Sequence, residues 1–157
     1  MRQKKHVLVI RFTTIDDVAV LVPIVQAVAV KYPDIRITVL SRGPSRKLFE
    51  NLAPNINFME ANLKEEYHGI KGLNALYRRL VAKQFTHVAD MQSIIRSLFL
   101  RLRFNLGRFR VEHISKRSLK NKQSVESSTV PSLAEEYTKV FAKLGFPIDD
   151  YQTEYFF

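Results

Sequence analysis

The stretch Val7–Val25, VLVIRFTTIDDVAVLVPIV, decides the fold, because an apolar strand breaks into a polar turn and then continues as an apolar helix. The run Val7–Ile10 is wholly apolar and mostly β-branched. That pattern is typical of a strand buried on both faces of a parallel sheet. In open α/β sheets, ligands bind beyond the carboxyl ends of the strands. The turn is therefore predicted to hold a site, and its polar residues are Arg11, Thr13, Thr14, Asp16 and Asp17.

Outward from this stretch, strands and helices are predicted to alternate. Strands are expected at Val7–Ile10, Ile35–Leu40, Ile56–Glu60, His87–Met91 and Phe109–Ile114, and helices at Ser45–Leu52, Leu73–Phe85 and Ser93–Phe104. A polar loop is expected at Ala61–Gly72. Such alternation predicts an α/β fold: a Rossmann-like open, mostly parallel sheet flanked by helices, as one domain over residues 1–157.

Two further helices are predicted, one after the first turn and one near the end of the sequence. Apolar residues at helical spacing from Val18 predict a helix in which Pro23 either makes a kink or begins the main segment Pro23–Lys31. For the last helix, Ser132–Glu135 fits a capping box and Gly145 follows the expected end. The lysine- and serine-rich segment Ser115–Pro131 before it is expected to be a mobile loop.

Composition excludes several classes of protein. The chain has 157 residues, 46% of them hydrophobic, which is enough for one compact core. It has no cysteine, so thiolate metal sites and disulfides are excluded, and its histidines lack metal-ligand spacing. The chain contains neither of the glycine-rich phosphate-binding patterns G-x-G-x-x-G and G-x-x-x-x-G-K-[ST], which argues against nucleotide binding by this domain alone. We expect no cofactor, no metal and no membrane span.

The positive charge is concentrated in one region. The formal net charge is +10, and residues 96–122 hold nine basic residues against the single acid Glu112. The basic residues are Arg96, Arg101, Arg103, Arg108, Arg110, Lys116, Arg117, Lys120 and Lys122. Such a cluster attracts anions without identifying them, so nucleic acid, anionic lipid, a phosphorylated glycolipid or a merely solvated face all fit.

Four segments carry a family resemblance. The first turn, IRFTTIDDV with a proline further on, resembles the opening of the heptosyltransferases of lipopolysaccharide synthesis, the family-nine glycosyltransferases. Ile35–Arg42 (IRITVLSR) is similar to their second strand, and His87–Ser97 (HVADMQSIIRS) to their "D-x-Q-x-x-x-R-S" segment. Ala134–Pro147 (AEEYTKVFAKLGFP) resembles the "ERY…LG-P" helix that closes their first domain. Four motifs in the family's order cover nearly the whole chain.

The resemblance implies a GT-B glycosyltransferase with two Rossmann-like domains and an active site between them. In such enzymes the N-terminal domain takes the lipid-linked acceptor and the C-terminal domain takes the nucleotide-sugar donor. The chain is therefore expected to be the acceptor-side half, inactive without its donor half. The implied partners are an ADP-heptose-like donor, bound only with the missing half, and an anionic glycolipid of the lipopolysaccharide core or lipid A precursor. The implied location is cytoplasmic, peripheral to the anionic surface of the inner membrane.

The resemblance also assigns roles to residues. Asp17 takes the place of the family's catalytic base, although an acid at this position also fits a helix N-terminus that it stabilises through the dipole. The residues predicted to bind the acceptor are Arg11, Thr13, Thr14, Asp16, Gln92, Arg96, Lys116 and Arg117. Four of them have a simpler alternative: a solvated strand end for Arg11, helix capping for the threonines, and an ion pair with Asp90 for Arg96.

Position 16 departs from the family pattern, which has glycine there. Asp16 places a second carboxylate beside the predicted base. If the glycine served a positive φ, aspartate would tolerate it less well, and if both carboxylates face one cleft, each hinders ionisation of the other. A second hypothesis therefore stays open, in which the chain is a stand-alone, non-catalytic basic module for anionic membrane or nucleic acid.

Overall fold

A computed structural model describes residues 4–12, 15–62, 68–91, 110–114 and 129–148. Its strands are β1 (His6–Ile10), β2 (Arg36–Ser41), β3 (Ile56–Glu60), β4 (His87–Asp90) and β5 (Arg110–His113). Its helices are α1 (Ile15–Lys31), the short 3₁₀ helix η1 (Gly43–Phe49), α2 (Gly69–Val81) and α5 (Thr129–Lys143). All five predicted strands are confirmed to within about one residue.

The strands form one parallel five-stranded sheet in the order β3-β2-β1-β4-β5. From β1 the chain moves outward to β2 and β3, and then returns to the other side of β1 as β4. The direction of winding therefore reverses between β1 and β4, whose last residues Ile10 and Asp90 are paired. A doubly wound sheet places its ligand crevice at the carboxyl ends of the two strands where this reversal occurs. The predicted fold class is confirmed.

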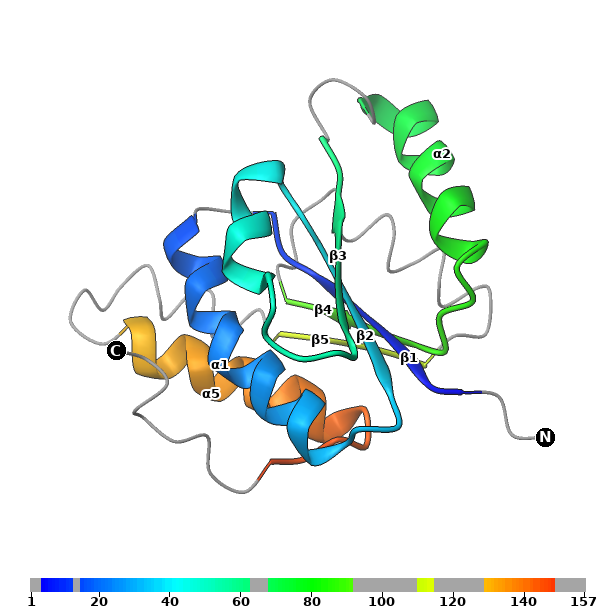
Figure 1. Cartoon of the computed structure of the whole chain (residues 1–157). Helices are drawn as coiled ribbons and strands as arrows, with labels where there is room; N and C mark the ends of the chain where they lie inside the picture. The colour runs from blue at the N-terminus through cyan, green and yellow to red at the C-terminus, as the bar shows by residue number, and fades with distance from the viewer. Residues whose placement is uncertain (1–3, 13–14, 63–67, 92–109, 115–128, 149–157) are drawn as a thin grey trace.

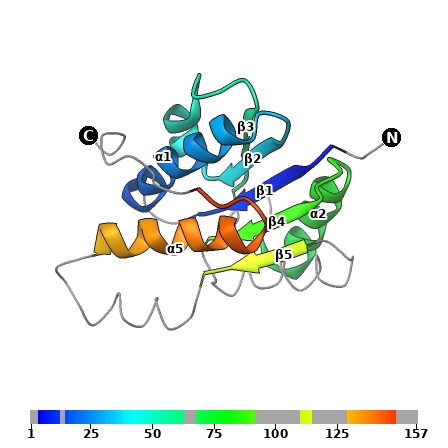
Figure 2. The ribbon, with the colours of Figure 1, turned by 90° about the horizontal axis from the view of Figure 1, so that it is seen from below.

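Helices cover the two faces of the sheet unequally (Figures 1 and 2). On one face, α1 and α5 lie side by side and bury the odd-numbered residues of β1, Val7 and Val9, in the larger core. On the other face, α2 packs over Leu8 and Ile10 in a smaller core. Because β1 is covered on both sides, its residues 7–10 are all fully buried, as their apolar run predicts.

Pro23 lies inside helix α1 and does not begin it. The helix runs without a break from Ile15 to Lys31 and contains Pro23, so the interpretation in which the main segment starts at Pro23 is wrong. Asp16 and Asp17 lie in its first turn, where their charges complement the helix dipole. The burial of eight of its side chains outweighs the cost of one missing backbone donor.

Other helix boundaries differ from the predictions. Helix α2 begins at Gly69, inside the predicted loop, and ends at Val81, so Phe85 lies outside it and is buried beside the ring of His6. The expected helix Ser45–Leu52 is the 3₁₀ helix η1, which starts earlier, next to Pro44. The expected helix Ser93–Phe104 lies outside the described residues.

The start of α5 differs from the prediction, whereas its predicted end is confirmed. The helix begins at Thr129, so Ser132 lies inside it instead of capping it, and Thr129–Pro131 are helical. At the other end, the amides of Gly145 and Phe146 donate to the carbonyls of Ala142 and Phe141, at 3.0 and 2.8 Å. This pair of bonds is a Schellman motif, in which Gly145 adopts φ +99°.

A substitution at Gly145 tests this motif. Gly145→Ala should lower the free energy of unfolding by about 1–2 kcal/mol, because an L side chain is strained at positive φ. Gly145→Asn should cost less, since asparagine tolerates the left-handed region better. Urea unfolding followed by circular dichroism measures both variants. Equal stability of Gly145→Ala and the parent would contradict the assigned conformation.

Candidate functional site

The candidate site lies at the carboxyl edge of the sheet, where β1 and β4 end side by side. Backbone hydrogen bonds continue one residue past the strands: the Met91 amide donates to Ile10 O at 3.0 Å, and the Arg11 amide donates to Leu40 O at 3.1 Å. Arg11 and Met91 are thus fixed in position as firmly as residues of the strands. They lie where the direction of winding reverses, the place at which sheets of this kind bind ligands.

The guanidinium of Arg11 is buried and joins several elements. Its Nη2 is 3.0 Å from Asp17 Oδ2, in the first turn of α1, and its Nη1 donates to the carbonyl of Met91, after β4. Its Cζ lies 5.9 Å from the ring centre of Tyr137, in α5. The expectation of a solvated strand end is therefore wrong. Contact between Arg11 and an anionic acceptor stays a prediction, for a side chain that already has protein partners.

Asp17 is held from both its side chain and its backbone. Its carboxylate pairs with Arg11, and its backbone carbonyl accepts a hydrogen bond of 3.0 Å from the hydroxyl of Tyr137. The side chain nevertheless stays 25% exposed. A carboxylate that is positioned by neighbours and still reachable can accept a proton from a bound hydroxyl. The assignment of Asp17 as a base stays a prediction, and its geometry suits that role.

Asp16 differs from its neighbour in environment. It is exposed, whereas Asp17 turns inward to Arg11. Asp16 belongs to the helical first turn, and the non-glycine residues with positive φ in the described part of the chain are Asn51 and Gln84. The backbone at position 16 therefore does not require glycine. The departure from the family pattern changes charge and exposure there without straining the fold.

Tyr137 is a site residue that the sequence analysis missed. It is fully buried on the inner side of α5, and burial is the main cause that raises the pKa of its phenol. The charge of Asp17 also raises that pKa, while Arg11 lowers it. The hydroxyl therefore stays protonated and keeps donating to Asp17 O. The quoted helix segment Ala134–Pro147 contains this tyrosine at a core position, which was the available signal.

The remaining predicted site residues divide between described and undescribed parts of the chain. Asp90, the alternative ion-pair partner of Arg96, is buried at the end of β4. The residues whose positions lie outside the described ranges are Thr13, Thr14, Gln92, Arg96, Lys116 and Arg117. Their roles in acceptor binding stay predictions, as does the mobility expected for residues 115–128.

Most of the predicted basic cluster is likewise undescribed. Its described member, Arg110, donates from Nη2 to the carbonyl of Lys143 at 2.8 Å. A cation at this place satisfies a carbonyl at the end of α5 and complements the negative end of the helix dipole. Arg110 therefore has a structural task beside any contribution to the overall field.

Two further findings concern the described ranges only. Within them, no three histidine, cysteine or acidic residues gather in a way that could hold a metal ion. None of the helices described there has the length and apolarity needed to cross a bilayer.

Comparison with known proteins shows the fold. No protein-family model matches the sequence, and no curated protein matches it. Among solved structures, a family-nine glycosyl transferase from Veillonella parvula aligns with 97% of this chain at 19% identity and a TM-score of 0.69. The E. coli heptosyltransferase WaaC, solved with ADP-2-deoxy-2-fluoro heptose, aligns with 96% of the chain at 16% identity and a TM-score of 0.61. The likeness is one of fold.

The extent of these alignments is informative. The chain covers 44% of the Veillonella structure and 51% of WaaC, so it spans about half the length of each. A UDP-N-acetylglucosamine 2-epimerase is also similar, with a TM-score of 0.54 over 88% of this chain. The resemblance inferred from the four sequence segments thus agrees with the structural neighbours, and the chain corresponds in extent to about half of each similar structure.

Tyr137→Phe tests the contact between α5 and the site. Loss of the hydrogen bond to Asp17 O should lower the free energy of unfolding by about 1 kcal/mol at neutral pH. The difference should shrink above about pH 10, by up to roughly 1.4 kcal/mol per pH unit. The reason is that Tyr137 ionises in the unfolded parent but keeps its proton in the folded one, so the parent alone loses this stability as pH rises.

Urea unfolding of both proteins at pH 7 and near pH 10.5 measures this effect. All other titrating groups are the same in the parent and the variant, so their contributions cancel when the two stabilities are subtracted. A stability difference that stays constant over this pH range would show that the hydroxyl of Tyr137 is not buried as described.

Proposed function

We propose that the chain is the acceptor-side half of a glycosyltransferase and that Asp17 is its general base. The observation that carries the proposal is the placement of Asp17. A partly exposed carboxylate, held by the buried Arg11, lies at the point of the sheet where ligands bind in this fold. The structural similarity to glycosyltransferases over nearly the whole chain supports the reaction class.

In the proposed reaction, a hydroxyl of the acceptor attacks the anomeric carbon of a nucleotide sugar. The new bond joins that carbon to the acceptor oxygen, and the bond between the carbon and the diphosphate breaks. The electron pair of the broken bond leaves with the nucleoside diphosphate. Asp17 takes the proton of the hydroxyl, which must lie within about 2.6–3.2 Å of the carboxylate. Arg11 holds the carboxylate in position throughout.

The substrates of this proposal come from the family resemblance. We assign an ADP-heptose-like sugar as donor, bound by a second half like the one that completes the similar structures. The assigned acceptor is an anionic glycolipid of the lipopolysaccharide core. The net charge of +10 favours such an acceptor and a peripheral position on an anionic cytoplasmic surface, at about 1 kcal/mol per basic residue near the lipid.

A binding experiment tests whether this chain binds the acceptor while the other half binds the donor. The 157-residue chain should bind deacylated lipopolysaccharide core fragments, with an affinity that falls as salt rises. It should not bind ADP-heptose tightly, because the donor site belongs to the other half. Isothermal titration calorimetry with both compounds measures this. Tight binding of the nucleotide sugar would overturn the proposal, and preference for single-stranded nucleic acid would favour a non-catalytic basic module instead.

The catalytic role of Asp17 is tested by two matched substitutions, made in a protein that carries both halves. Asp17→Asn keeps the size of the side chain and removes the proton acceptor, so turnover should fall by about 10²–10⁴-fold. Asp16→Asn makes the same chemical change at the exposed neighbouring residue and should leave turnover within a few-fold of the parent. Thermal unfolding of both variants checks that the fold persists.

The measurement is the initial rate of sugar transfer at saturating donor and acceptor. Equal turnover of Asp17→Asn and the parent would dismiss the base assignment. A large loss in Asp16→Asn as well would show that the reaction depends on the net charge of this turn and not on one carboxylate.

A further inference from the structure

One face of the sheet changes character along the strands. Near the carboxyl edge, this face presents apolar residues of β1, β2 and β3, among them Leu8, Leu40 and Met59, which form the smaller core with α2. Near the amino edge, the same face presents polar residues. These are His6, Arg36, Thr38 and Asn57, and the pairs His6–Arg36 and Thr38–Asn57 are register neighbours. Four polar side chains on one face are unexpected in a parallel sheet covered by helices.

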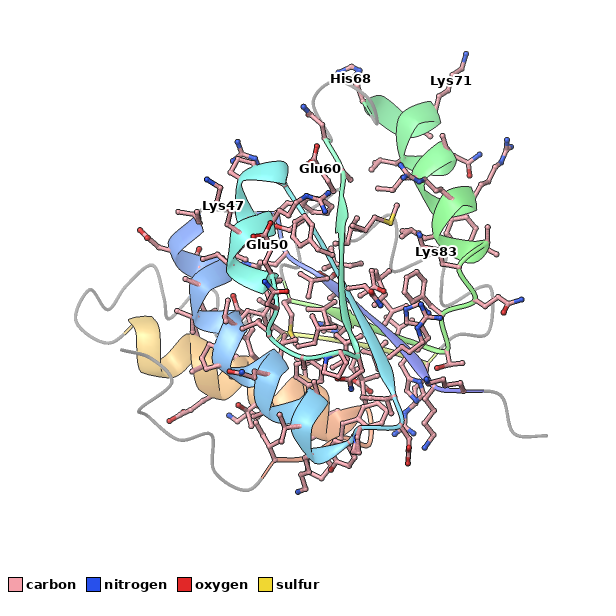
Figure 3. All side chains as sticks on the ribbon, viewed as in Figure 1. Lys47, Glu50, Glu60, His68, Lys71 and Lys83 are labelled. Carbon is pink, nitrogen blue, oxygen red and sulfur yellow. The ribbon has the colours of Figure 1, made fainter. Side chains whose placement is uncertain are left out.

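A cavity of about 400 Å³ opens over this polar part of the sheet. Residues from β1, β2 and β3 and the segment after α2 line it: His6, Arg36, Thr38, Asn57, Phe58, Met59 and Lys83. Lys83 follows the last turn of α2, whereas Lys71 belongs to its first turn, at the other end of the helix (Figure 3). Because α2 starts near the carboxyl edge and its far end reaches the amino edge, the cavity lies at the opposite end of β1 from Arg11 and Asp17.

The floor of the cavity is held in place by His6. The ring of His6 is buried, its Nδ1 donates to the carbonyl of Lys83 at 3.3 Å, and its Nε2 accepts from the hydroxyl of Thr38 at 2.7 Å. The ring of Phe85 lies against it, with centroids 4.2 Å apart. These contacts tie β1, β2 and the end of α2 together, so the cavity is formed before any ligand binds.

The described residues that line the cavity carry charges of one sign. Arg36 and Lys83 are cationic and exposed, and none of these described lining residues is acidic. The pKa of His6 is lowered, mainly by burial and then by the charge of Arg36, so this imidazole is neutral near pH 7. Two cations and the amide of Asn57 thus surround a polar space without a protein counter-charge among the lining residues. An anion with several oxygen atoms fits that arrangement.

We propose that this cavity is a second ligand site, which binds the phosphate group of a small phosphorylated compound. The guanidinium of Arg36 and the ammonium of Lys83 hold the phosphate, and Asn57 donates a further hydrogen bond. Phosphate alone is much smaller than the cavity, whose volume lies at the lower end of the range for small-molecule sites, so an organic portion shares the space. The site is independent of the proposed transfer reaction, because no residue is common to the two.

The test uses the 157-residue chain, with inorganic phosphate and glycerol 3-phosphate as probes. Two-dimensional NMR should show saturable shifts of the Arg36, Asn57 and His6 signals, with glycerol 3-phosphate binding more tightly than inorganic phosphate. The double variant Arg36→Gln/Lys83→Gln should weaken binding by at least about tenfold, since charge-assisted hydrogen bonds are lost. Both side chains are exposed, so the fold should persist, which circular dichroism checks.

The matched control is Lys47→Gln/Lys71→Gln, which removes two exposed lysines that do not line the cavity. It lowers the net charge by the same amount and should leave binding within about twofold of the parent. Equal weakening in both double variants would reduce the effect to general charge and overturn the site. No saturable binding of glycerol 3-phosphate by the parent below about 10 mM would overturn it as well.

Discussion

The buried guanidinium of Arg11 is the constraint on which the arrangement of the site depends. A cation taken out of water needs counter-charge and acceptors, and here they come from Asp17, from the carbonyl of Met91 and from the face of the Tyr137 ring. These partners belong to α1, to the segment after β4 and to α5. Breaking a buried pair by removing one member typically costs about 3–5 kcal/mol. The chain therefore places its candidate base where it also neutralises a buried charge.

The contacts of Asp17 with Arg11 and Tyr137 hold the start of α1 in place at the edge where sheets of this kind bind ligands. A general base must keep its position while substrates come and go, and the surrounding residues must hold it without covering it. Arg11 holds the carboxylate of Asp17, and Tyr137 holds its backbone carbonyl, so neither contact depends on a ligand. The rigid elements lie beneath the site, and the carboxylate remains partly open to solvent.

The sequence predicted the sheet well and the helix ends poorly, for physical reasons. Continuous apolar runs such as Val7–Ile10 are needed wherever both faces of a strand are buried, so the strands could be located from the sequence. Helix starts depend on weaker local signals. The capping box predicts that the last helix starts at Ser132, but α5 begins at Thr129. The glycine-containing segment before Leu73 is predicted to be a loop, but its residues from Gly69 onward belong to α2. The burial of Arg11 was missed because a charge at a strand end is ordinarily solvated, and its partners are distant in sequence.

Position 16 holds aspartate where the family pattern has glycine, and this difference affects the local charge more than the fold. A glycine there would matter for the fold if the backbone needed positive φ, but the residue is helical and its side chain is exposed. Aspartate in a first turn stabilises the helix through its dipole, typically by 0.3–1 kcal/mol, and restricts the chain more than glycine does. Asp16 thus stabilises helix α1, which also carries Asp17. The effect of Asp16 on the proposed function is then confined to the negative charge that it adds beside the proposed anionic acceptor, which is a matter of local electrostatics and not of folding.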